Sequence, residues 1–348
     1  MNVDNEKWAV QLRERYAAAI KGQPSARIRN VAERLGVSEL ELVAAGAGGL
    51  QARPLRAPPQ TIFRELGSLG RVMALTRNDW CVHERHGCYQ DVRAGQTMGI
   101  VLGPDIDLRL FFSHWGQVWA VDGPGRKSLQ FFDVAGGALH KVYMTPESDA
   151  AAWQAIIDRH SQADFAWPEL KALPADQPQG RTVAPSGLRQ DWLAMQDTHD
   201  FLPLLKRHEV DRLTALRDVG PDLAQRVEVG IAERMLVAVA ERDISLMCFV
   251  GNRGIIQIHS GPVQSLRRTG PWFNVLEPHF NLHLNTHAIH SAWVVNKPTT
   301  DGWVTSLECF SKTGEMIVQF FGARKPGQPE LVQWRALLES FCPIPLAA

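Results

Sequence analysis

The sequence lacks a charge imbalance, a disulfide pattern and a long apolar run. Lys and Arg together number 37, as do Asp and Glu, so no basic excess predicts binding to nucleic acid or to an anionic membrane. The five cysteines are an odd number without CxxC spacing, which is typical of reduced thiols in a cytoplasm. No apolar stretch is long enough to cross a bilayer, and the first residues include acidic side chains where a signal peptide needs a basic start. We therefore expect a cytoplasmic protein with no membrane-embedded part and no nucleic-acid partner.

The sequence repeats itself once. VMALTRN (72–78) corresponds to LMCFVGN (246–252), and at the same offset of 174 positions the segment 99–122 corresponds to 273–296. The sequence therefore predicts a tandem duplication of a unit of roughly 150 residues, a size that buries a core of its own.

Each repeat has the pattern of a mixed fold. Ser38 and Glu41 predict a capping box at the start of a helix, and Gly46 stands where that helix would end. Short runs rich in Val, Ile, Phe, Leu and Trp follow, which are typical of antiparallel strands and hairpins. Each repeat closes with an amphipathic helix around a tryptophan, Trp153 and Trp334 respectively. We expect an α+β fold of two units, each a large antiparallel sheet with helices packed on one side.

A segment dense in Pro, Gly and polar residues separates the repeats. It spans 168–187 and predicts a linker. The expected division is an N-terminal unit at 1–167 and a C-terminal unit at 188–348, with ligand chemistry where the units meet.

The segment after the linker sets a histidine among apolar residues. Four side chains follow at helical spacings and would share one face: Trp192, Met195, His199 and Leu202. Pro203 would clash with the carbonyl of His199, so we expect the helix to bend or break there. Such a break favours presentation of the imidazole to a ligand. A half-buried histidine that bonds to Asp197 or Asp200 explains the same spacing.

Longer motifs extend from this segment across most of the chain. They are QDTHDFLPLLKRHEVDRLTALR, DIDLRLFF, CFVGNRGIIQIHSGP, FNLHLN, AWVVNKPTTDGWVTSLECF and QFFGARKPGQPE. Together they resemble the hemin-degrading factor family, the HemS-like haem-binding proteins of bacterial iron acquisition, from about residue 25 to the end. The resemblance implies a haem cleft between the two repeats, with haem b (hemin) as ligand or substrate.

The resemblance also implies the residues of the site. His199 matches the axial ligand to the haem iron, and Arg109 matches an arginine on the opposite haem face that holds a distal water, hydroxide or oxygen species. The other matching positions are two pocket aromatics and three cations near the propionates: Phe111, Phe249, Arg212, Lys297 and Arg324. Val318 stands where some members carry a propionate-binding tyrosine, so we expect one contact to be missing.

This residue set suits the chemistry of a ferric porphyrin. The macrocycle needs an imidazole nitrogen, a broad apolar slot and cations for two propionates. Without the resemblance, the two arginines near the propionates would be interpreted as surface charges, and Lys297 as an exposed turn residue. Phe111 and Phe249 would be interpreted as ordinary core residues of strands.

Other histidine and cysteine patterns offer weaker alternatives. The histidines with a helical zinc-site spacing are His279, His283, His287 and His290. The repeat alignment predicts strand and turn there instead, which would spread them too far apart for one ion. If haem slides or binds transiently during transfer, the candidate secondary ligands are His208, His259 and His283. Cys81 with the nearby His83 and His86 would offer a nucleophile and a base, but we interpret this segment as a loop, so the alternative is weak.

Two functions from different classes are consistent with these patterns. One is a cytoplasmic carrier that sequesters imported haem and passes it to a haem oxygenase or another acceptor, with contacts to haem importer components. The other is an enzyme that opens the porphyrin with oxygen and a reductant such as NAD(P)H, with Arg109 as the distal catalytic residue. An axial histidine serves both. The sequence does not distinguish a monomer from a homodimer.

Overall fold

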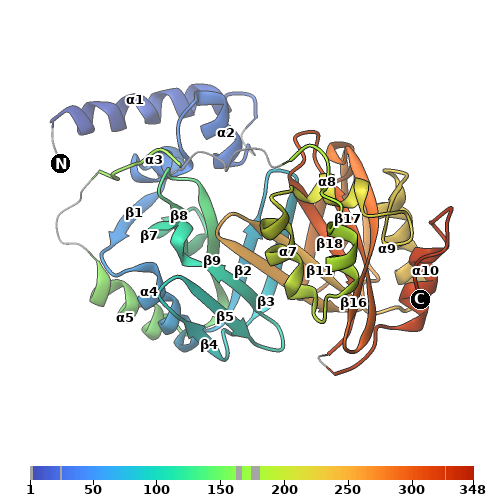
Figure 1. The fold of residues 1–348 in the computed structure, drawn as a ribbon. Coiled ribbons are helices and arrows are strands. Elements are labelled where there is room, and N and C mark those ends of the chain that lie inside the picture. Colours follow the sequence, from blue (N-terminus) through green and yellow to red (C-terminus); the bar gives the residue numbers. More distant parts are fainter. Residues whose placement is uncertain (1–2, 24–25, 162–166, 174–180, 326) are drawn as a thin grey trace. The chain divides into compact units, whose positions relative to one another are not determined.

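The structure is a computed structural model that describes residues 3–23, 26–161, 167–173, 181–325 and 327–348. Part of the expected linker, residues 174–180, lies outside the described residues. Within the described ranges, two nine-stranded sheets and a set of helices make up the fold (Figure 1). None of the helices in those ranges has the length and apolar character needed to cross a membrane.

The first sheet contains strands from both repeats. Its spatial order is β1 (Gln51–Leu55), β7 (Trp115–Gly123), β8 (Arg126–Asp133), β9 (Ala138–Ser148), β2 (Gly70–Arg77), β3 (Cys81–Gly87), β15 (Phe280–Asn285), β14 (Trp272–Leu276) and β13 (Leu266–Thr269).

The second sheet has the corresponding order. It runs β10 (Ala224–Val227), β16 (Ser291–Thr299), β17 (Gly302–Phe310), β18 (Met316–Gly322), β11 (Leu246–Asn252), β12 (Ile255–Gly261), β6 (Asp107–Phe111), β5 (Met98–Leu102) and β4 (Val92–Ala94).

The duplication found in the sequence recurs in this strand order. The repeated motif VMALTRN lies in β2 and continues to Asn78, its partner LMCFVGN forms β11, and both strands are fifth in their sheets. The prediction of two large antiparallel sheets is confirmed. The last three strands of each sheet come from the other repeat, a feature that the sequence pattern did not predict. Alternating hydrophobicity indicates that a strand is half-buried, but it does not name the strand's partner.

The exchange of strands divides the chain into two compact units that are not simple halves. The first unit comprises 1–77, 84–174 and 252–257, and the second comprises 78–83, 175–251 and 258–348. The division passes through β3 and β12, so each of these strands contributes residues to both units.

The helices group by unit. The first unit holds α1 (Val3–Ile20), α2 (Ile28–Leu35), α3 (Glu39–Ala44), α4 (Pro59–Glu65) and α5 (Ala150–His160). The second holds α6 (Leu188–Leu193), α7 (Phe201–His208), α8 (Arg212–Asp218), α9 (Ile231–Glu241) and α10 (Val332–Glu339). Short 3-10 turns are η1 (Ala47–Gly49), η2 (Leu66–Leu69), η3 (Phe112–His114), η4 (Thr198–Asp200) and η5 (Thr286–Ala288).

Several helices form as the sequence predicts. Ser38 caps α3 in a complete capping box with Glu41, and Gly46 follows its end with a left-handed φ of 72°. The two tryptophan helices are α5 and α10, whose Trp153 and Trp334 are buried. The indole of Trp334 donates a hydrogen bond to the backbone oxygen of Thr305 at 2.9 Å, which anchors α10 on β17.

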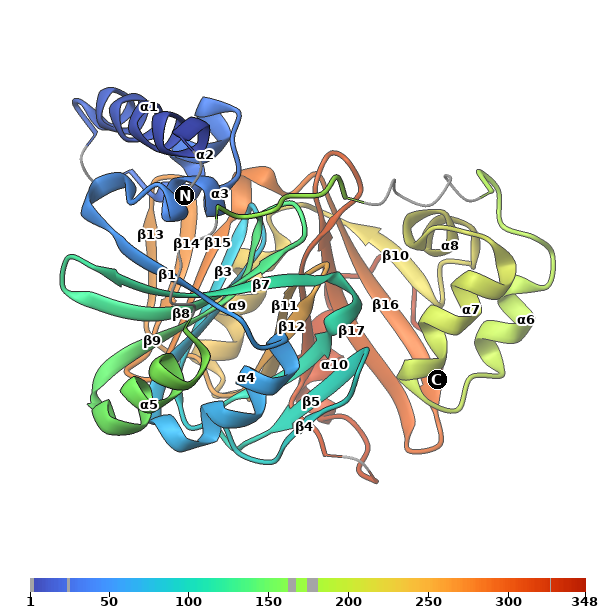
Figure 2. The ribbon, with the colours of Figure 1, turned by 90° about the vertical axis from the view of Figure 1, so that its left-hand side faces the viewer.

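In the second unit, the helices build two separate apolar cores. Residues of α9 and α10 pack on β11, β17 and β18 around Met235, Leu307 and Phe320. Residues of α6, α7 and α8 form another cluster with Val295 and Phe310, and Figure 2 shows these three helices beside β10 and β16. The second cluster lies under the segment that carries His199.

Two asparagines at equivalent repeat positions lie where the chain passes from one unit into the other. Asn78 is the first residue of the second unit after β2. Its Nδ2 donates to the backbone oxygens of Gly251 at 3.1 Å and Ile317 at 2.8 Å. Asn78 therefore ties its chain segment to β11 and β18.

Asn252 repeats this arrangement in the first unit. Its Nδ2 donates to the backbone oxygens of Arg77 at 3.0 Å and Leu139 at 2.8 Å. Its side-chain oxygen accepts the backbone N–H of Gly254. Because each amide satisfies several backbone groups at once, these side chains fix the geometry of the crossing points.

We expect Asn252→Ala to lower the free energy of unfolding by about 1–3 kcal/mol, because the mutation leaves backbone groups without partners. Urea denaturation followed by circular dichroism measures the change. The control is Asn30→Ala on the exposed surface of α2, where we expect a change within about 0.5 kcal/mol. Equal effects of the two substitutions would contradict this role for Asn252.

Candidate functional site

The segment around His199 is broken into two helices and a tight turn. Helix α6 ends at Leu193, the 3-10 turn η4 spans Thr198–Asp200, and α7 begins at Phe201. Pro203 is the third residue of α7, in the first turn, where no intrahelical N–H is required. The predicted break in the helix is confirmed.

The prediction that His199 shares one apolar helical face with its neighbours is wrong. Trp192 and Met195 are buried, whereas Leu202 is 62% exposed and the side chain of His199 is 86% exposed. The chain leaves the α-helical path between α6 and η4, so spacing along the sequence no longer relates these positions. His199 therefore faces solvent rather than the core.

Asp197 holds the histidine in place. Its Oδ1 accepts the backbone N–H of His199 at 2.8 Å and lies 2.5 Å from the ring Nδ1. The bond to a carboxylate assigns the ring proton to Nδ1. No described residue forms a hydrogen bond with Nε2, so this nitrogen is available as an acceptor or ligand. The backbone N–H of His199 and, more weakly, the charge of Arg324 lower the pKa of Asp197.

Arg212 and Lys297 meet at one buried carboxylate. Arg212 Nη1 donates to Glu308 Oε2 at 2.8 Å, and Lys297 Nζ donates to Glu308 Oε1 at 2.8 Å. Burial alone would raise the pKa of Glu308, but Arg212 and Lys297 outweigh it and lower that pKa to about 2. Burial, together with the charge of Arg212, lowers the pKa of Lys297, and Glu308 offsets only part of this effect. Lys297 is 3% exposed in β16, so its interpretation as an exposed turn residue is wrong.

An aromatic ring connects this ion cluster to the histidine segment. Phe201 is the first residue of α7, two positions after His199. Its ring centroid lies 4.6 Å from Lys297 Nζ and 4.7 Å from Arg212 Cζ. Cations over an aromatic face are stabilising. The cluster therefore anchors the start of the helix that follows His199, and its two cations with one carboxylate leave a net positive charge.

Arg324 has an unused donor. Its Nη2 lies 3.6 Å from Asp301 Oδ2, too far for a good hydrogen bond. Its Nη1 is buried and no described residue accepts a hydrogen bond from it. A buried guanidinium donor without an acceptor is costly. This orphaned donor, whose charge reaches Asp197, fits an anionic group of a ligand near the histidine turn.

The predicted aromatic Phe249 lies on β11 and is half-buried. Its ring lies 4.9 Å from that of Phe321, measured between centroids. These two rings offer a partly exposed apolar surface in the second unit, although nothing in the described contacts joins them to His199.

The remaining predicted residues, Arg109 and Phe111, lie in the first unit on β6. Leu108 and Leu110 of this strand are buried, so Arg109 and Phe111 share the opposite, half-exposed face. Arg109 forms an ion pair with Asp107 on that face. Burial raises the pKa of Asp107, and the charge of Arg109 offsets only part of this rise.

The histidines with zinc-site spacing lie in strand β15, turn η5 and the residues beside them, as the repeat alignment predicts. The described part of the chain contains no group of three or more side chains placed to hold a metal ion. The secondary candidates contact protein groups: His208 bonds Asp191 at 2.8 Å, His283 bonds Asn274 at 2.7 Å, and His259 stacks on Phe280.

The interpretation of residues 81–86 as a loop is wrong. Cys81, His83 and His86 lie in strand β3, where alternate side chains point to opposite faces. Cys81 and His83 are buried, and Cys81 belongs to an apolar core.

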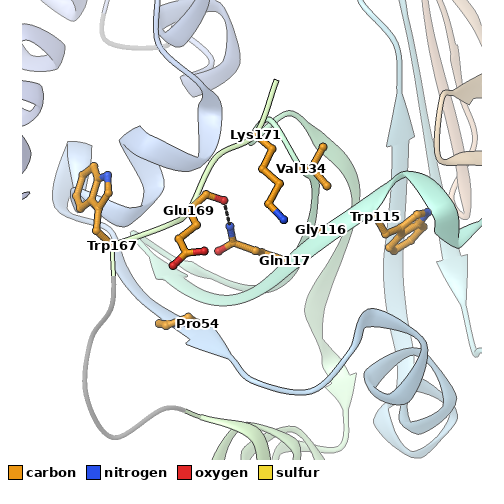
Figure 3. A pocket seen from close by; sticks show the side chains of 8 residues that line it. All are labelled: Pro54, Trp115, Gly116, Gln117, Val134, Trp167, Glu169 and Lys171. Atoms are coloured by element: carbon orange, nitrogen blue, oxygen red, sulfur yellow. Dashed lines mark hydrogen bonds between the residues drawn. The ribbon is translucent and has the colours of Figure 1, made fainter. Parts of the chain in front are cut away.

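An open depression of about 440 Å³ lies in the first unit, and none of the predicted site residues lines it (Figure 3). Its lining consists of Pro54, Trp115, Gly116, Gln117, Val134, Trp167, Glu169 and Lys171. Gln117 donates a hydrogen bond to the backbone oxygen of Glu169 across it at 3.1 Å.

Sequence reasoning missed Glu308 and Phe201. Glu308 is a charged residue inside the apolar stretch of β17, in a sheet whose strands are buried. A lone carboxylate in such a strand indicates a buried ion pair, because an unpaired buried charge is strongly destabilising. Phe201 had no comparable signal, since a phenylalanine at the start of a helix is ordinary.

Comparison with known proteins identifies the family. A model described as the haemin-degrading HemS.ChuX domain matches residues 36–160 and again residues 209–341. The chain belongs to this family. The two matches fall in the two repeats, as expected for a duplicated HemS-like domain.

Relatives match over nearly the whole chain. The hemin transport protein HemS of Yersinia enterocolitica is 36% identical over 327 residues, covering 92% of this chain and 94% of that protein. The structure of apo-PhuS, a heme-binding protein from Pseudomonas aeruginosa, is 44% identical with a TM-score of 0.91, covering 96% and 99% of the two chains. The structure of ChuS, an E. coli heme oxygenase, is 35% identical with a TM-score of 0.85, covering 95% and 99%. The resemblance to HemS-like proteins and the α+β fold are thus confirmed.

We expect Glu308→Gln to destabilise the protein by about 3–5 kcal/mol near neutral pH, because the buried Lys297 and the half-buried Arg212 would lose their counter-ion. The folded-state pKa of Glu308 is depressed to about 2, so its stabilising contribution is full above the ordinary pKa near 4.5 and disappears as the pH falls towards 2. The difference between wild type and mutant in urea unfolding should shrink over that range. Exposed Glu241→Gln is the control, and a pH-independent difference would contradict this account.

Proposed function

We propose that this protein binds haem through His199 and handles imported haem in the cytoplasm, where it sequesters the haem and delivers it to a haem oxygenase or another acceptor. The main structural support for this proposal is the exposed imidazole of His199, whose Nδ1 is bonded to Asp197 and whose Nε2 has no partner among the described residues. An imidazole nitrogen free of protons is the usual proximal ligand of haem iron. The similarity to the hemin transport protein HemS and the heme-binding protein PhuS supports this proposal.

The basic residues of the second unit suit the propionates of haem. The orphaned Nη1 of Arg324 provides a donor for a carboxylate. Arg212 and Lys297 already share Glu308, so we propose that they act through their net positive charge rather than as unpaired donors. Phe249 and Phe111 are proposed as aromatic contacts to the macrocycle.

An alternative is a haem-degrading enzyme. It is favoured by the similarity to the structure of ChuS, which is described as an E. coli heme oxygenase. Bound haem would supply the redox chemistry with oxygen, and electrons would come from NAD(P)H or another donor. In this alternative Arg109 would donate charge-assisted hydrogen bonds to an anionic distal group. Its partner Asp107 would then have to release it.

A hemin titration with absorption spectroscopy tests the axial ligand. We expect wild type to give a stoichiometric Soret band that shifts or weakens in His199→Ala, because that mutation removes the ligating nitrogen. His287→Ala is a matched control, since His287 is also an exposed histidine in a 3-10 turn whose backbone N–H is capped, here by Asn285. A Soret band that is indifferent to His199→Ala would refute the proposal.

To distinguish the two functions, the absorption spectrum of the haem-loaded protein is followed under air after addition of a reductant, with catalase present. Loss of the Soret band with formation of a linear tetrapyrrole supports the enzyme. A band that moves only when an acceptor protein is added supports the carrier.

We expect Arg324→Gln to weaken hemin binding about 10- to 100-fold, the value of a charge-assisted hydrogen bond of roughly 1.5–3 kcal/mol. The same mutation should have little effect on binding of the hemin dimethyl ester, which has no carboxylates. The control is Arg234→Gln, an exposed arginine of α9 paired with Glu228. Equal weakening for hemin and its ester would show that Arg324 does not bind a propionate.

A further inference from the structure

The hydrogen bond between Asp197 and His199 has a consequence for the strength of the ligand. We propose that Asp197 is a positioning residue that orients His199 and increases the electron-donating strength of its Nε2 towards haem iron. This inference rests on the proposed function, in which His199 is the axial ligand.

The orientation of the imidazole depends on one carboxylate oxygen. Asp197 Oδ1 accepts from the backbone N–H of His199 and from its ring Nδ1, at 2.8 Å and 2.5 Å. The side chain of His199 is 86% exposed, so packing contributes little to holding the ring. Two bonds to the same oxygen fix the ring relative to its own backbone and direct Nε2 away from Asp197.

The charge of Asp197 matters as well as its shape. When a histidine donates its second N–H to a carboxylate, the electron density and basicity of the ligating nitrogen increase. A more basic ligand stabilises the ferric state over the ferrous state, so it lowers the reduction potential of bound haem. The arrangement thus matches a strongly donating axial ligand.

The same turn provides a matched control. Asp200 accepts the backbone N–H groups of Gln196 and Asp197, both at 3.0 Å, and forms no hydrogen bond with the imidazole. Asp197→Asn and Asp200→Asn therefore make the same isosteric change, remove one charge each and disturb the same capping box. Only the first removes a charge from the hydrogen bond to His199.

The first experiment determines the tautomer of His199 in the protein without haem. ¹⁵N NMR of the histidine rings should show His199 protonated on Nδ1 in wild type and in Asp200→Asn. In Asp197→Asn we expect the proton to shift towards Nε2, the tautomer that an imidazole prefers in water. Protonation of His199 on Nε2 in the wild type would overturn the orienting role without reference to haem.

The second experiment measures the strength of the iron–histidine bond in the haem-loaded protein. In Asp197→Asn we expect hemin affinity to fall about 10- to 100-fold, the iron–histidine stretching frequency of the ferrous protein to fall in resonance Raman spectra, and the reduction potential to rise. Asp200→Asn should leave the frequency and the potential at the wild-type values.

Two failures are distinguishable. If both mutations weaken hemin binding equally and neither changes the stretching frequency, Asp197 only caps the turn and this inference is wrong. If wild type shows no iron–histidine band and His199→Ala binds hemin normally, the proposed function itself is wrong.

Discussion

The fold depends on the amide side chains of Asn78 and Asn252. Each lies at a point where the chain passes between the compact units, and each donates two hydrogen bonds to backbone oxygens of the unit it enters. A buried backbone group without a partner is costly. Each asparagine provides a donor for two backbone oxygens where the chain changes unit, so it joins its own segment to two further strands of the unit that it enters.

A second constraint acts beneath the candidate site. Glu308, Arg212 and Lys297 form a buried ion cluster whose cations also contact the ring of Phe201. The cations contact Phe201 at the start of α7, and the exposed turn with His199 immediately precedes this helix. The exposed His199 therefore lies next in sequence to a helix whose first residue contacts a largely buried part of the second unit. Such support from behind is what a ligand needs in order to keep its orientation while remaining accessible.

Local signals in the sequence predicted local structure well. The capping box of Ser38 and Glu41 depends on residues three positions apart, and α5 and α10 depend on helical periodicity around their tryptophans. His199 does not share a helical face with Trp192 and Met195, because the chain from Trp192 to Leu202 is not one continuous helix. Helical spacing places side chains relative to each other only while the backbone stays helical, and the chain between α6 and η4 does not.

The sequence by itself determined the duplication, the α+β class and the family, and its resemblance to that family nominated His199 as the haem ligand. These features are carried by residue order and by patterns within short segments. Only the tertiary structure decided that the two repeats exchange strands, that Glu308 pairs with both Arg212 and Lys297, and that His199 is exposed with Nδ1 bonded to Asp197. The physical reason is that strand partners, ion pairs and burial depend on residues far apart in the chain, whose meeting is set by packing rather than by local preference.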